Sequence, residues 1–173
     1  MRIFLLVAVL TLGSALSTRA QVPGASDSLR AQANRMTNGL ISGDYTTFIR
    51  YMYPKVVELS GGTANLKQAL QQMTRQFDSL GMSFQSITVD SLSDFVKTAT
   101  QLQATIRQHT AMKVPHGRSV ATSTLVGISL DNGVHWKFLD SHNMTLAVMR
   151  QVMPNLSTRL VIPPQQPPVH YEQ

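Results

Sequence analysis

The spacing of apolar side chains divides the chain into a helical first half and a strand-rich second half. Between residues 26 and 80, apolar residues recur every three or four positions, which is the period of an amphipathic helix. After Gly81 the period shortens to two, which is typical of half-buried strands. This order predicts an α+β fold in which N-terminal helices pack on one face of a curved antiparallel β-sheet.

Three helices are predicted in the first half. The first spans residues 26–42. The second begins after Asp44 and ends before Pro54, because proline disfavours helix at the residue that precedes it. Residues 55–60 are expected to form a short strand or an extended link. The third helix covers residues 63–80. Its apolar stripe consists of Leu66, Ala69, Leu70, Met73, Phe77 and Leu80.

Three long strands are predicted next, over residues 82–92, 95–114 and 119–130. The turns between them are too short for the crossovers of parallel βαβ units, so neighbouring strands are expected to be antiparallel. Apolar and polar residues alternate along the middle strand. Its polar face carries Lys97, Gln101, Gln103, Arg107 and His109.

Residues 129–138 have the pattern of a β-hairpin. The Asp131-Asn132-Gly133 turn supplies residues that tolerate positive φ, which a tight turn between twisted strands needs. His135 is expected to face solvent. The apolar residues of the following strand are expected to share the core face: Val134, Trp136 and Phe138.

A short helix and a proline-rich tail close the chain. The helix is expected to begin at a cap supplied by Ser141 or Asn143 and to end at Pro154. Residues 24–163 are therefore predicted to form a single domain, and residues 164–173 a flexible Pro-rich tail. The apolar residues of the helix are Leu146, Met149 and Met153.

Residues 1–20 have the layout of a secretory signal peptide. A positive start at Arg2 precedes a nearly continuous apolar run, and small residues precede a cleavage position after Ala20. The run is too short to span about 30 Å of hydrocarbon as a helix. An exported protein, periplasmic or secreted, is therefore expected, with no transmembrane segment after cleavage. The chain contains no Cys, which excludes disulfides and lipid attachment through cysteine.

The charge of the chain does not indicate nucleic-acid binding. The formal net charge of +6 falls to +4 on cleavage, because loss of Arg2 and Arg19 leaves 13 of the 15 basic residues against 9 acidic ones. The basic residues are not clustered, whereas nucleic-acid binding usually needs a basic stripe on one face. Those of the helical half, for example, are spread along it: Arg30, Arg35, Arg50, Lys55, Lys67 and Arg75.

The order of the elements resembles the nuclear transport factor 2-like superfamily of SnoaL-like or cystatin-like cone folds. The segment from Asn38 to Tyr45 is similar to the junction of the first two helices there, and Trp136-Lys137-Phe138 is similar to the late core strand. The resemblance covers most of the chain after residue 20 and implies a cone-shaped domain of a small exported bacterial protein. The superfamily includes isomerases, dehydratases, cyclases, ligand binders and interaction domains, so the resemblance selects no activity.

The spacing Ser129-x-Asp131-x-Gly133-x-x-Trp136 is similar to the Asp-box hairpin of sialidase propellers. In that motif the Asp accepts hydrogen bonds from the turn, and the aromatic residue packs beneath it. A propeller needs one copy per blade, and this chain has one copy and too few residues. The motif is therefore interpreted as a staple of the hairpin.

Two residues are candidates for catalysis. Asp140 comes two residues after Phe138, so alternation along the strand is expected to point it to the same apolar face as Trp136 and Phe138. Desolvation there would raise the pKa of Asp140 and suit it to act as a general base. Alternatively, Asp140 ends the strand in water or caps the next helix. His109 lies deep in a long strand, where it either enters a cleft or has only a structural role in the strand. The candidates for ligand contact are Tyr51, Tyr53 and Trp136. Alternatively, the two tyrosines only cover the edge of the core. No spacing indicates a metal site, and no cofactor is expected.

Three functions are compatible with these patterns. The preferred one is an exported non-enzymatic domain that binds a small apolar ligand or a protein partner. The second is an isomerase, dehydratase or cyclase that uses Asp140 with a tyrosine or with His109. The third is a structural homodimer, joined sheet to sheet through the polar Thr/Gln-rich face.

Overall fold

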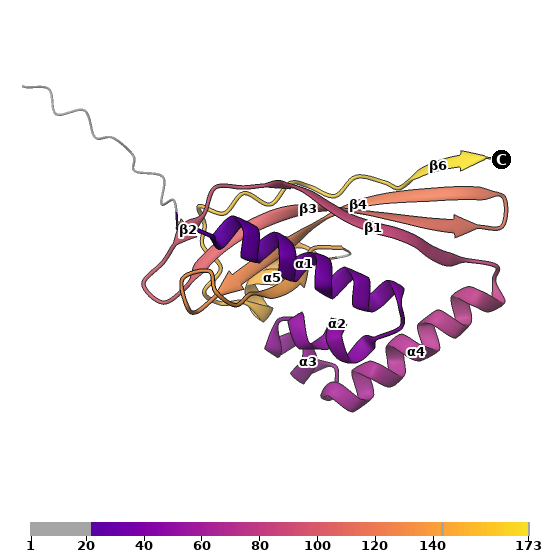
Figure 1. Cartoon of the computed structure of the whole chain (residues 1–173), viewed down its shortest axis with the longest axis horizontal. Coiled ribbons are helices and arrows are strands. Elements are labelled where there is room, and N and C mark those ends of the chain that lie inside the picture. Colours follow the sequence, from indigo (N-terminus) through magenta and orange to yellow (C-terminus); the bar gives the residue numbers. More distant parts are fainter. Residues whose placement is uncertain (1–21, 143, 173) are drawn as a thin grey trace, which may run out of the picture.

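The structure is a computed structural model that describes residues 22–142 and 144–172 (Figure 1). The signal peptide predicted for residues 1–20 lies outside the described residues. The helices are α1 (Ala25–Ile41), α2 (Tyr45–Tyr51), α3 (Pro54–Leu59), α4 (Thr63–Ser79) and α5 (Leu146–Val152). The strands are β1 (Ser83–Leu92), β2 (Val96–Lys97), β3 (Leu102–Val114), β4 (Gly117–Ser129), β5 (Lys137–Asp140) and β6 (Val169–Glu172). Helices followed by an antiparallel sheet confirm the predicted α+β fold.

The strands form one antiparallel sheet in the order β1–β3–β4–β5, with β2 added beside β3 and β6 beside β4. β3 and β4 make a long hairpin that pairs over its whole length, from Leu102 opposite Ser129 to Val114 opposite Gly117 (Figure 1). β5 and β6 pair with different parts of β4, which leaves residues 121–124 of that strand between them.

One face of the sheet packs against α1. Ala104, Gly127 and Phe138 lie side by side across β3, β4 and β5, so they share this face. Ala104 and Phe138 belong to a buried cluster with Leu29 of α1. A Cβ atom at Gly127 would lie 3.2 Å from the Trp136 ring, so the absence of a side chain lets the ring lie close to the sheet.

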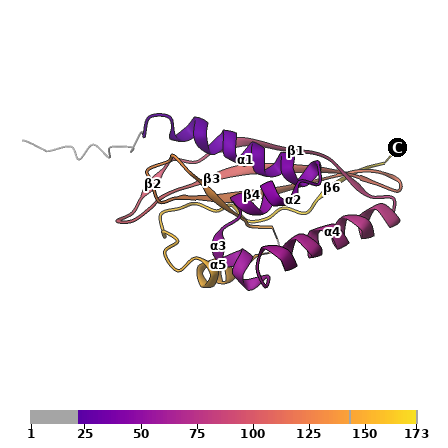
Figure 2. The ribbon, with the colours of Figure 1, turned by 60° about the horizontal axis from the view of Figure 1, so that its bottom comes forward.

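The opposite face is covered by the C-terminal segment. Val126 and Leu139, each one position along from Gly127 and Phe138, belong to a second buried cluster with Met149 of α5. Figure 2 shows α1 and α5 on opposite sides of the sheet. The sheet is therefore the middle of three layers, with α1 on one side and α5 and the segment after it on the other.

Polar residues of β3 also contact the C-terminal segment. Gln103 is completely buried; its amide nitrogen donates to the Asn155 carbonyl at 2.8 Å, and its amide oxygen accepts the Ser157 N–H at 2.9 Å. The Thr105 hydroxyl donates to the Val161 carbonyl at 3.3 Å. The predicted polar face of this strand is therefore partly interior, because the end of the chain returns across it.

Residues 55–60 do not form the predicted strand or extended link. Asp44 caps α2 by accepting the Thr47 N–H at 3.1 Å, and α2 ends before Pro54, as predicted. Pro54 also begins α3. Its fixed φ suits the first helical position, where the missing N–H would have had no partner in the helix. The prediction is wrong here because it considers only that proline ends the helix before it, and not that proline can also begin the next helix.

The strand predicted over residues 95–114 is interrupted. β2 pairs antiparallel with the start of β3, so the segment folds back on itself. The turn is closed by the N–H and the hydroxyl of Thr98, which donate to the Gln101 carbonyl at 2.9 and 3.1 Å. No Gly or Pro marks this turn, so alternation alone extends the predicted strand through it.

The last strand is shorter than predicted. Trp136 and Phe138 face the core and are 1% and 2% exposed, but Val134 is 59% exposed. β5 begins only at Lys137, because the residues before Trp136 belong to the turn. His135 is exposed, as predicted.

The C-terminal elements also differ from the prediction. α5 is capped by Thr145, whose hydroxyl oxygen accepts the Val148 N–H at 3.3 Å. The hydroxyl of Ser141 instead accepts the Thr124 N–H at 3.1 Å, and Asn143 lies outside the described residues. The segment predicted as a flexible tail contains β6, an exposed strand paired with the start of β4.

Candidate functional site

Asp140 points to the α1 face of the sheet, as its phase predicts. It pairs with Leu125 in the register and lies two residues after Phe138, so it shares their face. Its Oδ1 accepts the His142 N–H at 2.9 Å, and its Oδ2 accepts the Gln108 amide at 3.0 Å. Desolvation by burial raises the pKa of Asp140, although these hydrogen bonds act in the opposite direction.

His109 lies on the other face of the sheet. It directly follows Gln108 in β3, and successive side chains of a strand point to opposite faces. Its Nε2 lies 2.8 Å from a carboxylate oxygen of Asp90, and its Nδ1 lies 3.1 Å from the Thr122 hydroxyl. The sheet therefore separates His109 from Asp140, and the two catalytic candidates do not form one site.

Trp136 lies in the core beneath α1. Its side chain stacks on Phe95 with ring centroids 5.9 Å apart. Its indole N–H donates to the Ser28 hydroxyl at 2.9 Å and to the Gly133 carbonyl at 3.0 Å. The predicted ligand contact is thus a side chain that protein atoms surround, and its one polar group is bonded within the fold.

Tyr51 and Tyr53 lie on opposite sides of the sheet. Tyr51 packs against the cluster beneath α1, and Tyr53 packs against the cluster on the other face. The chain crosses the edge of β5 between them, where the Tyr53 N–H donates to the Phe138 carbonyl at 2.8 Å. Tyr53 thereby reaches a groove on the face opposite α1.

This groove has a volume of about 550 Å³, within the roughly 300–1,000 Å³ typical of ligand pockets. It lies between α3 on one side and the ends of β4 and β5 on the other. Most of its accessible surface is apolar. Its apolar residues are Tyr53, Pro54, Ile128 and Leu130, and its polar residues are Lys55, Glu58, Gln101, Asp131, His135 and Lys137.

Two pairs of charged or titratable side chains in the groove contact each other within the protein. The Lys55 ammonium lies 2.6 Å from a Glu58 carboxylate oxygen, and the Asp131 carboxylate lies 2.6 Å from a His135 ring nitrogen. Lys137 differs, because its ammonium donates to the backbone carbonyl of Arg50 and has no carboxylate partner among the described residues. Lys137 is therefore the groove's available positive charge.

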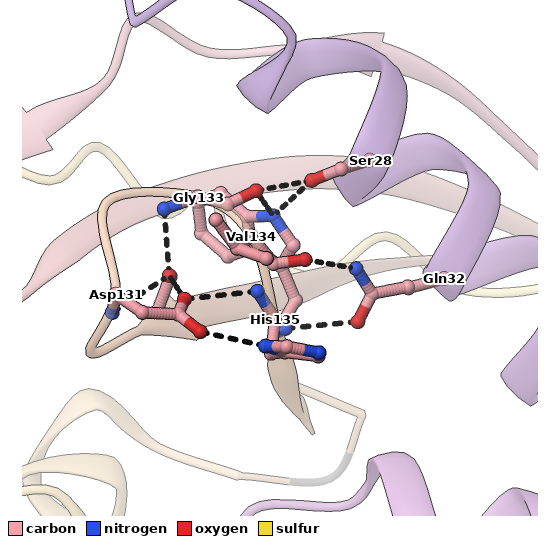
Figure 3. Close-up of polar contacts among 8 residues, drawn as sticks. Ser28, Gln32, Asp131, Gly133, Val134 and His135 are labelled. Atoms are coloured by element: carbon pink, nitrogen blue, oxygen red, sulfur yellow. Dashed lines mark hydrogen bonds and ion pairs between the residues drawn. The ribbon is translucent and has the colours of Figure 1, made fainter.

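The turn before β5 forms one wall of the groove. The Ser129 hydroxyl donates to Asp131 Oδ1 and accepts the Gly133 N–H, both at 2.8 Å, and Asp131 Oδ1 also accepts the His135 N–H at 2.9 Å (Figure 3). Asn132 and Gly133 have φ values of 54° and 93°, as the predicted turn requires. The Asp-box-like spacing is therefore a staple that holds the wall in place.

Gln32 of α1 holds the same turn from the other side. Its amide nitrogen donates to the Val134 carbonyl at 2.8 Å, and its amide oxygen accepts the Trp136 N–H at 2.9 Å (Figure 3). Sequence reasoning misses this role, although Ser28 and Gln32 stand one turn apart beside the apolar stripe of the helix. Their i, i+4 spacing puts both side chains on one side of α1, which indicates that polar groups border the core at this place.

The hydrogen bonds of Asp131 predict a pH dependence of stability. The His135 N–H first, and then the His135 ring and the Ser129 hydroxyl, lower the pKa of Asp131 from 3.8 to about 2. Because the folded-state pKa lies below the unfolded value, the ionised side chain stabilises the fold above about pH 4, and this contribution is lost as the pH falls toward 2.

The measurement is the melting temperature between pH 5 and pH 2. Asp131→Asn is expected to lower it at pH 5 and to flatten the fall toward pH 2, whereas Asp27→Asn, an exposed position in the first turn of α1, serves as the control. Equal slopes for the wild type and Asp131→Asn would contradict the assignment.

Lys137 and Ile128 are groove residues that sequence reasoning misses. Alternation along β5 places Lys137 on the face opposite Trp136 and Phe138, which is a usable signal. Tyr53 is a predicted ligand contact, and the predicted turn before β5 supplies Asp131 and His135, but α3 and Gln101 are distant in the sequence, so no local pattern brings these parts together into a groove.

Metal ligands, membrane-spanning helices and known relatives do not point to another candidate. Within residues 22–142 and 144–172, no group of three or more His, Cys, Asp or Glu is placed to hold a metal ion. No helix in that part of the chain is long and apolar enough to cross a membrane. Comparison with protein-family models, curated proteins and solved structures finds no match.

Proposed function

We propose that this protein is an exported domain of the nuclear transport factor 2-like type that binds a small, largely apolar ligand with one acidic group in the groove beside α3. One observation carries the proposal: the groove combines an apolar lining with an ammonium, that of Lys137, which is not neutralised by a carboxylate in the described residues. Burial of the ligand's apolar body supplies affinity, and a charge-assisted hydrogen bond to Lys137 fixes its orientation.

Export and superfamily membership have separate support. The apolar run and the small residues before Ala20 support export. The order of helices and antiparallel strands supports the superfamily.

The geometry disfavours the two alternative functions. For an isomerase, dehydratase or cyclase that uses Asp140 with His109, the two groups would have to share a pocket, but they lie on opposite faces of the sheet. For the form that uses a tyrosine, the described hydrogen bonds to the Asp140 carboxylate come from Gln108 and the His142 N–H rather than from a tyrosine hydroxyl. A homodimer joined through the polar face needs that face to be free, but Gln103 and Thr105 are bonded to the C-terminal segment. The groove beside α3 remains as a site with an accessible, mostly apolar lining.

The test is binding of three probes with the same alkyl chain, measured by isothermal calorimetry on the purified protein. We expect dodecanoate to bind more tightly than dodecanol, and dodecyltrimethylammonium to bind most weakly. Lys137→Met should weaken dodecanoate binding about tenfold, since a hydrogen bond to a charged group contributes about 1.5 kcal/mol or more. The same substitution should leave dodecanol binding nearly unchanged.

Lys113→Met is the matched control. Lys113 is exposed near the far end of β3 and is not a groove residue, so its substitution removes the same charge without touching the site. Absence of saturable dodecanoate binding would overturn the proposal, and so would equal effects of Lys137→Met and Lys113→Met.

A further inference from the structure

Three polar side chains form a continuous relay across β1, β3 and β4, on the face opposite α1. Thr122 of β4 lies directly opposite His109 of β3, and its hydroxyl is 3.1 Å from His109 Nδ1. The Nε2 atom of the same ring is 2.8 Å from Asp90 of β1. A hydroxyl, an imidazole and a carboxylate linked in this order are the parts of a nucleophile, a general base and the group that orients the base.

Asp90 is held in a way that suits the orienting role. One of its carboxylate oxygens accepts the Ser91 N–H, and the other faces the imidazole of His109. The Ser91 N–H and the His109 ring lower the pKa of Asp90. An ionised Asp90 accepts a hydrogen bond from Nε2–H, which leaves Nδ1 of the neutral ring to accept the Thr122 proton.

The relay opens into a small polar pocket. Its volume is about 170 Å³, below the roughly 300–1,000 Å³ of typical ligand pockets, so it suits a short group. Thr122 and His109 line it together with Arg107, and Pro163 and Pro164 of the C-terminal segment lie on its other side. The side chains of His109 and Asp90 are 34% and 50% exposed, so water has access to the relay.

The backbone of Thr122 supplies a second polar group at this place. The N–H and the carbonyl of Thr124 point to the outer edge of β4, where both bond to Ser141. Because backbone directions alternate along a strand, the N–H of Thr122 points to the same edge. Thr122 lies outside the registers that β5 and β6 form with β4, so neither strand takes up this N–H.

We propose that this cluster is a second site, which hydrolyses small carboxylic esters with a short acyl group, with Thr122 as nucleophile, His109 as general base and Asp90 as the orienting carboxylate. The Thr122 Oγ–H proton passes to His109 Nδ1 while Oγ bonds to the ester carbonyl carbon. The tetrahedral oxyanion is stabilised by the Thr122 N–H and by the Arg107 guanidinium. Collapse breaks the carbon–alkoxy bond, and the leaving alcohol takes the proton from His109.

Water then completes the reaction. It gives a proton to His109 Nδ1 and bonds to the acyl carbon; the bond from that carbon to Thr122 Oγ breaks, and Oγ recovers the proton. The sum is ester plus water giving acid plus alcohol, with no redox partner and no metal required. The site shares no lining residue with the groove beside α3, so its test is independent of the proposed binding function.

The test is hydrolysis of p-nitrophenyl acetate by the purified protein, together with peptide mass spectrometry of protein quenched during turnover. We expect an acetyl group on Thr122 and a loss of at least tenfold in kcat/KM for Thr122→Val and for His109→Gln. Asp90→Asn should also lower kcat/KM, because the ring is then no longer held in the reactive tautomer. Thr122→Ser keeps the nucleophile and should retain activity.

The control is His116→Gln. His116 is an exposed residue of the β3–β4 turn, and its loss measures the unspecific reaction of a surface imidazole with this ester. Circular dichroism confirms the fold of each variant. The proposal is overturned if the wild type hydrolyses the ester no faster than Thr122→Val, if His116→Gln and His109→Gln have equal effects, or if acetylation spares Thr122.

Discussion

Trp136→Ala is expected to lower the free energy of unfolding by about 3–5 kcal/mol, the usual range for removing a buried aromatic side chain. The side chain is 1% exposed, so its removal leaves a cavity beneath α1. It also leaves the Ser28 hydroxyl and the Gly133 carbonyl without the indole N–H. This loss is a large part of the roughly 5–15 kcal/mol that stabilises a typical domain.

Urea unfolding followed by far-ultraviolet circular dichroism measures the effect. Trp136→Phe keeps a ring but removes the indole N–H, so its smaller loss of about 1–3 kcal/mol separates packing from hydrogen bonding. Val134→Ala is the surface control, two residues earlier and 59% exposed, and should change stability by less than about 0.5 kcal/mol. A Trp136→Ala protein within about 1 kcal/mol of the wild type would contradict the core role.

Gln103→Ala is expected to destabilise the protein by about 2–4 kcal/mol and to loosen the C-terminal segment. The substitution leaves the Asn155 carbonyl and the Ser157 N–H without their partner, and each unsatisfied buried group costs about 1–3 kcal/mol. Cleavage by trypsin after Arg159, which lies on the affected segment, should become faster because that segment detaches more often.

Two further variants separate the effect of the amide hydrogen bonds from that of packing and from that of an unrelated substitution. Gln103→Leu has a similar side-chain volume but no hydrogen bonds, so we expect it to be cleaved nearly as fast as Gln103→Ala. Gln71→Ala, at an exposed position of α4, should match the wild type. If Gln103→Leu restores wild-type resistance to trypsin, packing rather than the amide attaches the segment.

Much of the fold follows from local patterns. The helical period locates α1 and α4, and the Asp44 cap and Pro54 bound α2. The period of two locates β1 and the β3–β4 hairpin. The errors occur where one residue has two effects, as at Pro54, or where a turn lacks a typical residue, as between Thr98 and Gln101.

The candidate sites follow from the sequence much less. Alternation along the strands places the side chain of Asp140 on the same face as Phe138 and that of His109 on the opposite face, so the face on which each side chain lies can be predicted. Alternation does not reveal that the C-terminal segment covers Gln103, because that contact joins positions about fifty residues apart. It also gives no means of finding the partners of His109, since Asp90 and Thr122 come from two other strands.

Trp136 is the only tryptophan of the chain, and it lies beneath α1. The tryptophan fluorescence of the protein therefore reports on the α1 layer and not on the C-terminal layer on the other face. Circular dichroism reports on the backbone of both. Coincident denaturation curves from the two signals would mean that the layers unfold together, whereas an earlier change in the dichroism would mean that the C-terminal layer detaches first.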